Sequence, residues 1–193
     1  MESVGLPGDA PMVASPPPSR RTPWVLALAA LLPACGASFP EPAHPGQAVP
    51  EEPPPFVFPE ELALYIGHPD VRIVDARAAR SWRRGHVPGA VHLDWTELRD
   101  PQGGALTGKL DEDFDRLATL VGGRGIGDRH WVVVVGDPLE GWGEEARIAW
   151  VLRVLGHDRV SLLDGGMAAW RAADLPTQRG QLVGADPGHV GLR

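Results

Sequence analysis

Two kinds of side chain in this sequence could do nucleophilic or acid–base chemistry, and they lie far apart along the chain. The only thiol is Cys35, at the end of a short apolar run. A group of acids follows a run of valines, at Asp137, Glu140, Glu144 and Glu145. Carboxylates this close together oppose the binding of an anion and disfavour a nearby thiolate. A carboxylate nucleophile at Asp137 would need a neighbouring acid and an electropositive pocket, and the sequence shows neither.

The elements that must position these acids lie between residues 60 and 177, where short apolar runs alternate with amphipathic ones. Strands are expected at residues 71–74, 90–93, 131–135 and 160–163, and helices at 60–66, 78–84, 111–121, 144–155 and from about 166 to 170. The run at 131–135 is wholly apolar, which is typical of a parallel strand covered on both faces. The alternation predicts an α/β fold with right-handed crossovers. Because ligands in such folds lie beyond the carboxyl ends of the strands, the loop after Val135 is the first candidate site.

Apolar spacing within the helices predicts which side chains reach the core. Phe114, Leu117, Ala118 and Val121 share one face of the helix at 111–121, and Ile148, Val151, Leu152 and Leu155 share one face of the helix at 144–155. Two tryptophans, Trp150 and Trp170, are also expected in the core. Trp142 lies in the loop after the valine strand, so it is expected to be exposed and is the better candidate for contact with a ligand or a partner.

Two motifs flank this valine strand. They are Val74-Asp75-Ala76-Arg77 followed by residues 82–92 (WRRGHVPGAVH), and residues 155–160 (LGHDRV) followed by 163–170 (LDGGMAAW). The first resembles the N-terminal signature of rhodanese domains and the second resembles their C-terminal signature, in the same order and at the same spacing. The resemblance covers residues 60–177. It implies a rhodanese-like α/β fold, with a parallel, doubly wound sheet and helices on both faces.

In active rhodaneses, a cysteine after the central strand carries a persulfide, in a loop whose N–H groups form an anion cradle. In this chain the resemblance places that position on Gly136, or on Asp137 because the loop is longer than the usual active loop. The longer loop resembles the non-catalytic N-terminal half of tandem thiosulfate sulfurtransferases. The loop residues that could line a pocket are Gly136, Asp137, Glu140, Gly141, Trp142 and Gly143.

The other residues that match the family motifs are expected to have structural roles. They are Asp75, Arg77, His86, Pro88, Gly89, Asp164, Gly165 and Gly166. Buried polar groups in loops usually serve as hydrogen-bonded anchors, and the Pro-Gly and Gly-Gly pairs mark turns. The side chain of Asp137 is expected to bind loop N–H groups in place of a missing anion. Glu144 and Glu145 suit the first turn of a helix, where acids favour the helix dipole.

The first third of the chain has a different composition, because fifteen of the 21 prolines lie before residue 60. Arg20 and Arg21 precede an apolar stretch of about ten residues, which predicts a signal peptide over residues 1–35 and is too short to span a bilayer. Residues 32–35 resemble a bacterial lipobox, which implies lipidation of Cys35. Residues 36–59 are predicted to form an extended Pro-rich tether, and residues 178–193 a C-terminal tail. Translation could start at Met1 or at Met12.

This organisation predicts an exported bacterial lipoprotein that faces the periplasm. Gly36 follows Cys35 where an aspartate would be associated with the inner membrane, so the resemblance favours the outer membrane. The expected partners are the membrane, through lipidated Cys35, and another protein. A formal net charge of −7 argues against nucleic acid, and the acidic loop argues against a small anion. No cofactor and no metal are expected, since His86 and His92 lack further ligands nearby.

Three hypotheses of function follow. The first is a rhodanese-like domain without the catalytic cysteine, acting as a binding or regulatory module at the bacterial envelope. The second is the non-catalytic half of a split thiosulfate sulfurtransferase, whose partner chain supplies the cysteine. The third is an enzyme of the same fold that uses Asp137 as its nucleophile. The residues around Asp137 do not supply the neighbouring acid and the electropositive pocket that this chemistry requires.

Overall fold

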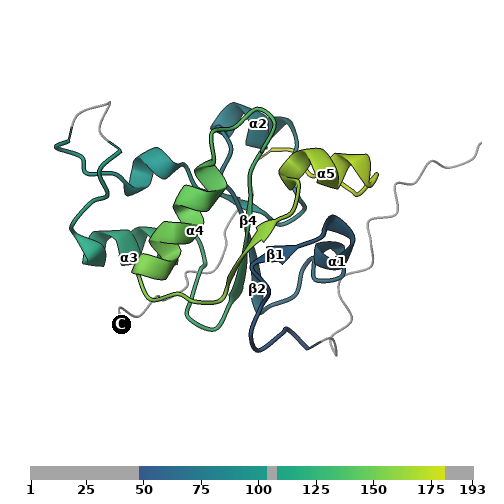
Figure 1. Cartoon of the computed structure of the whole chain (residues 1–193), viewed down its shortest axis with the longest axis horizontal. Coiled ribbons are helices and arrows are strands. Elements are labelled where there is room, and N and C mark those ends of the chain that lie inside the picture. The colour runs from purple at the N-terminus through teal and green to yellow at the C-terminus, as the bar shows by residue number, and fades with distance from the viewer. Residues whose placement is uncertain (1–47, 104–107, 181–193) are drawn as a thin grey trace, which may run out of the picture. The chain divides into compact units, whose positions relative to one another are not determined.

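The computed structural model describes residues 48–103 and 108–180, and every structural statement below concerns these residues. They form one sheet of five parallel strands in the order β1-β5-β4-β2-β3 (Figure 1). This confirms the predicted α/β fold with a parallel sheet. The predicted signal peptide with Cys35, half of the predicted tether and most of the predicted tail lie outside the described residues.

The elements follow the predicted alternation closely. The strands are β1 (Phe56–Val57), β2 (Val71–Asp75), β3 (Val91–His92), β4 (Trp131–Val135) and β5 (Val160–Leu163). The helices are α1 (Pro59–Ala63), α2 (Ala79–Arg84), the 3-10 helix η1 (Trp95–Leu98), α3 (Phe114–Gly122), α4 (Glu144–Val154) and α5 (Gly166–Ala172). Within these residues no helix has the length and apolar composition needed to cross a bilayer.

Two hydrophobic clusters lie on opposite faces of the sheet, and β4 contributes to both. Val132 and Val134 pack with α3 and α4, whereas Trp131, Val133 and Val135 pack with α1 and α5. Successive side chains of a strand point to opposite faces, so an uninterrupted apolar run fits a strand with helices on both sides. Figure 1 shows β4 between these two helix pairs. The central strand thereby fixes the position of the loop that follows it.

The packed region begins earlier in the chain than the predicted boundary at residue 60. Phe56 and Val57, which fall in the predicted tether, form β1 and pair with Leu162 and Leu163 of β5. The side chain of Val57 is fully buried. The prolines before it lack a backbone N–H but still have a carbonyl oxygen that can accept a hydrogen bond. The Leu162 N–H donates to the Pro55 oxygen at 2.9 Å. An edge strand tolerates proline in this way, so a proline-rich composition conceals β1 in the sequence.

The packed region also extends beyond residue 177. The backbone N–H of Gln178 donates to the His86 carbonyl and the N–H of His86 donates to the Gln178 carbonyl, both at 2.9 Å. The side-chain oxygen of Gln178 accepts from the N–H of Gly89 at 3.0 Å. Residue 178, assigned to the tail from the sequence, therefore holds the segment between α2 and β3 in place.

Two predicted core positions are exposed. Trp150 is 47% exposed and the guanidinium carbon of Arg147 lies 4.7 Å from its ring centre. Residue 150 is two positions after inward-facing Ile148, about 200° around the helix, so the prediction for Trp150 is wrong. Phe114 is also exposed, because α3 begins at this residue and its inner face is formed by Leu117 and Val121. Trp170 is fully buried, as predicted.

Candidate functional site

Three loops meet at the carboxyl ends of the central strands. Asp75 at the end of β2 is paired with Val135 at the end of β4, and the Ala76 N–H donates to the Val135 carbonyl at 2.9 Å. On the other side, the N–H of Met167 in α5 donates to the carbonyl of Gly136 at 2.9 Å. The loop at residues 136–143 is therefore held between the loops that follow β2 and β5. This is the edge at which parallel α/β folds bind ligands.

The space beside Gly136 is occupied by the carboxyl group of Glu145. A Cβ atom at position 136 would overlap Oε2 and Cδ of Glu145 and would lie 2.8 Å from its Cγ. Glu145 is the second residue of α4, and side chains on a helix tilt toward its N-terminus, which directs this one back over the end of β4. Its Oε2 atom is buried and has no hydrogen-bond partner among the described residues. The acid thus takes the volume that a side chain at position 136 would need.

The loop satisfies several of its own N–H groups. The N–H groups of Glu140 and Gly141 donate to the backbone carbonyl of Asp137, at 3.2 and 2.6 Å. The N–H of Trp142 donates to Oε2 of Glu144 at 3.0 Å. The expectation that the Asp137 side chain binds loop N–H groups is therefore wrong: its backbone carbonyl and the carboxylate of Glu144 do so. These three donors are used within the loop, where an anion cradle would direct them at a ligand.

The outer side of the loop is apolar and exposed. Trp142 is 61% exposed, as predicted, and its ring meets the ring of Trp95 edge-on at 5.2 Å. Leu139 is 82% exposed. Gly143 has a φ of 102° and precedes α4, so the loop enters the helix through a backbone conformation that favours glycine. The loop therefore presents an aromatic and an aliphatic side chain outward, and Glu140 is exposed as well.

A buried ion pair holds the end of β2. The Arg77 guanidinium donates to Asp75 through Nη2 at 2.6 Å and through Nε at 3.0 Å, and both side chains are almost completely buried. Arg77 Nη2 also donates to the carbonyl of Gly85 at 2.8 Å. The backbone N–H of Arg77 donates to Asp75 Oδ1 at 3.0 Å. The bidentate geometry ties the loop after β2 to the end of α2.

The remaining motif residues form the frame around this ion pair. His86 is fully buried, stacks on Trp82 at 4.6 Å, and lies 2.9 Å from the Trp82 carbonyl through Nδ1. Gly89, which follows Pro88, has a φ of 79° and is needed for the turn before β3. His92 Nε2 lies 2.8 Å from the Arg77 carbonyl. Both histidine rings therefore lie against backbone carbonyls, and His86 also stacks on an aromatic ring.

The loop after β5 depends on two glycines. Asp164 is exposed at its start. Gly165 has a φ of 66° and Gly166 a φ of 55°, both in the left-handed region that favours glycine. A Cβ on Gly166 would overlap the Gly136 carbonyl oxygen and lie 2.7 Å from Pro138 Cδ. The two loops therefore approach each other at a distance that only glycine permits.

The chemistry available at this edge is limited by the residue types present. Residues 136–143 contain no cysteine, lysine, arginine or histidine. In residues 48–103 and 108–180, no group of three or more histidine, cysteine or acidic side chains could hold a metal ion. The space at the end of β4 contains the carboxyl group of Glu145. The position of Glu145 was not expected from the sequence, and no sequence pattern distinguishes it from Glu144.

The overlap at position 136 predicts a specific coupling between two residues. Gly136→Ala is expected to lower the free energy of unfolding by about 1 kcal/mol, because the added methyl group displaces the carboxyl group at the end of the flexible Glu145 side chain. In a Glu145→Ala background the same substitution is expected to cost less than about 0.5 kcal/mol, since Gly136 has an ordinary backbone conformation. Urea denaturation of the two single variants and the double variant measures the coupling. Equal costs of Gly136→Ala in both backgrounds would show that Glu145 does not fill this space.

Comparisons with known proteins agree with the fold and the motifs. A sequence profile of the Rhodanese-like domain matches residues 58–173. The thiosulfate sulfurtransferase of Corynebacterium glutamicum is 34% identical over 145 residues, which is 72% of this chain and 42% of that protein. The thiosulfate sulfurtransferase of Azotobacter vinelandii is 33% identical over 128 residues, 65% of this chain and 45% of that protein. The chain thus spans less than half the length of these curated relatives.

Solved structures show the same similarity. The crystal structure of SseA from Escherichia coli, described as a 3-mercaptopyruvate sulfotransferase with the rhodanese fold, superposes with a TM-score of 0.63 and 29% identity. The match covers 72% of this chain and 55% of that one. The 3-mercaptopyruvate sulfurtransferase of Escherichia coli is 33% identical over 139 residues, 65% of this chain and 47% of that protein.

Proposed function

Because this chain belongs to the family of rhodanese-like domains, and its curated relatives include sulfurtransferases, we propose that it is a non-catalytic member that acts as a binding or regulatory module. The observation that supports this most directly is at position 136, where glycine stands at the end of β4 and the Glu145 carboxyl group fills the adjacent space. Neither residue can carry a persulfide. The only thiol, Cys35, lies outside the described residues.

The charge and hydrogen bonding of the loop support the same proposal. Asp137, Glu140, Glu144 and Glu145 are the charged residues between positions 136 and 145, and all are acidic. An oxyanion donor such as thiosulfate would be repelled there. The N–H groups of residues 140–142 already have acceptors, in the loop and in the first turn of α4. The exposed side chains of Leu139 and Trp142 fit a surface for protein contact instead.

For the location, we propose attachment to the bacterial envelope through lipidation of Cys35, with the outer membrane favoured and the domain facing the periplasm. The resemblance of residues 32–35 to a lipobox and the Pro-rich segment that follows support this proposal. Under it, the lone cysteine serves as an anchor and is not available as a sulfur carrier.

The catalytic part of the proposal is tested by sulfur transfer from thiosulfate, and separately from 3-mercaptopyruvate, to cyanide. The full chain and its Cys35→Ser variant are assayed, with the Azotobacter vinelandii thiosulfate sulfurtransferase as positive control. We expect no thiocyanate above the buffer rate from either form. A rate that disappears in Cys35→Ser would show that this thiol carries sulfur and would contradict the proposal. A rate that persists in Cys35→Ser would contradict it as well.

A second candidate function is the non-catalytic half of a split thiosulfate sulfurtransferase. The observation in its favour is that the chain matches less than half the length of its curated relatives, as one half of a two-domain enzyme would. A separate rhodanese-like chain with a loop cysteine would have to bind this one. Copurification of such a chain, with sulfur transfer that rises when the two purified chains are mixed, supports this candidate. No rise on mixing favours the independent module.

A further inference from the structure

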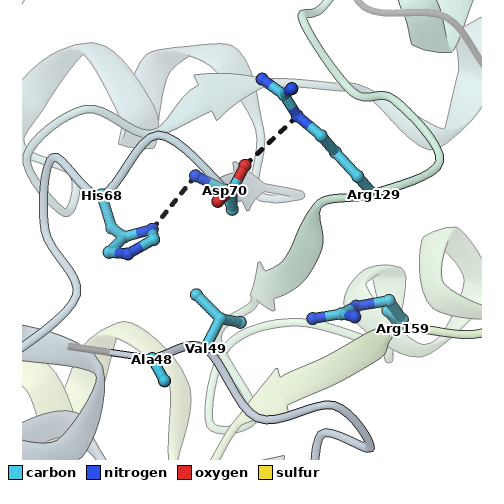
Figure 2. A pocket seen from close by; sticks show the side chains of 6 residues that line it. All are labelled: Ala48, Val49, His68, Asp70, Arg129 and Arg159. Atoms are coloured by element: carbon cyan, nitrogen blue, oxygen red, sulfur yellow. Dashed lines mark hydrogen bonds and ion pairs between the residues drawn. The ribbon is translucent and has the colours of Figure 1, made fainter. Parts of the chain in front are cut away.

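A hollow of about 340 Å³ lies at the amino-terminal ends of the central strands, the edge opposite the loop at residues 136–143. Its charged wall comes from residues placed just before three strands: Asp70 before β2, Arg129 before β4 and Arg159 before β5. His68 completes this wall, and Ala48 and Val49 form an apolar wall. Figure 2 shows the six side chains around the same space. The strand register brings these residues together although they are distant in sequence.

Arg159 is a cation whose charge the described residues leave without a counter-ion. Its Nη2 donates to the carbonyl of Pro50 at 2.9 Å, and its Nε–H is buried without an acceptor. In the part of the chain that the structure describes, no carboxylate lies within ion-pair distance of this guanidinium. A partly buried guanidinium that is anchored but unpaired is costly. An anion in the adjacent hollow would compensate for this cost.

The rest of the wall sets the charge that such an anion can carry. Arg129 Nε lies 3.2 Å from Asp70 Oδ1, so Asp70 is paired with Arg129 and the charge of Arg159 remains. The excess is one positive charge, in a chain whose formal net charge is −7.

We propose that this hollow binds a small organic monocarboxylate, independently of the loop after β4. Arg159 and Arg129 supply planar guanidinium groups, which match the two oxygens of a carboxylate. Asp70 opposes a second negative charge in the same place. The apolar wall at Ala48 and Val49 receives a short aliphatic stem. Together these features favour a ligand with one negative charge and an apolar tail over an inorganic dianion.

The experiment is a nuclear magnetic resonance titration of the full chain with butanoate, and separately with sulfate, at constant ionic strength and pH 7. The backbone amide signals of residues 48, 49 and 159 report binding. We expect saturable shifts with a dissociation constant in the millimolar range and weaker binding of sulfate. Arg129→Gln and Arg159→Gln are each expected to weaken butanoate binding about fivefold to tenfold, the effect of losing one charge-assisted hydrogen bond.

Arg171→Gln is the matched control, because this arginine is exposed on α5 and does not line the hollow. Its affinity for butanoate is expected to equal that of the parent chain. The exposed Arg129 keeps the test valid if Arg159→Gln impairs folding through loss of the bond to Pro50. The proposal is overturned by shifts that do not saturate, by sulfate binding as tightly as butanoate, or by equal weakening in Arg171→Gln. Sulfur-transfer assays do not enter this test, so its outcome is separate from that of the proposed function.

Discussion

Arg77→Met is expected to lower the free energy of unfolding by about 3–5 kcal/mol, the cost of removing one partner from a buried ion pair. The substitution leaves the carboxylate of Asp75 fully buried and without its guanidinium partner. It also removes the donor that reaches the carbonyl of Gly85. Because small domains have only about 5–15 kcal/mol of stability in total, the variant should unfold at a much lower urea concentration, which circular dichroism measures.

The same substitution at an exposed ion pair is the control. Arg129 pairs with Asp70 at 3.2 Å, with side chains that are 74% and 44% exposed. Arg129→Met is expected to cost less than about 1 kcal/mol, as is usual for surface ion pairs. If Arg77→Met proves no more costly than Arg129→Met, then the Asp75–Arg77 pair does not hold the end of β2.

The fold could be predicted from the sequence because the strongest local patterns agree with the tertiary structure. The valine run at β4 needs helices on both faces, and the structure places α3 and α4 on one face and α1 and α5 on the other. The strand β1 could not be predicted, because its two residues follow a run of prolines and pair only with the distant β5. Pairing over a hundred residues apart leaves no local periodicity.

The position of the candidate site could be predicted from the sequence, but the arrangement of side chains within it could not. Its position followed from the end of a parallel strand, and the absence of a thiol at residues 136 and 137 is visible in the sequence. What fills the site depends on the direction of one side chain in the first turn of α4. Glu144 and Glu145 are neighbours with the same chemistry, yet one accepts a bond from the Trp142 N–H and the other lies against Gly136. Their different roles follow from the 100° rotation between adjacent helical residues and from the course of the loop.

Gly166→Ala is expected to lower the free energy of unfolding by about 3 kcal/mol, from two additive causes. The first is backbone strain, because Gly166 has a φ of 55°, a region in which a residue with a Cβ is disfavoured. The second is steric, because the new Cβ would overlap the carbonyl oxygen of Gly136, a backbone atom that cannot rotate away as a side chain can. That oxygen also accepts the hydrogen bond from Met167, so a shift of the loop would weaken this bond as well.

Gly89→Ala separates the two causes. Gly89 has a φ of 79°, closer to that of Gly166, but a Cβ there would meet nothing within 4 Å, so only the backbone cost of about 1–2 kcal/mol is expected. Urea denaturation of both variants gives the steric cost at Gly166 as the difference between them, which should exceed about 1 kcal/mol. Equal costs would mean that the loops after β4 and β5 do not approach as closely as the structure shows. A larger cost at Gly166 would instead show that this contact fixes the path of the loop from Gly136, and with it the space that Glu145 fills.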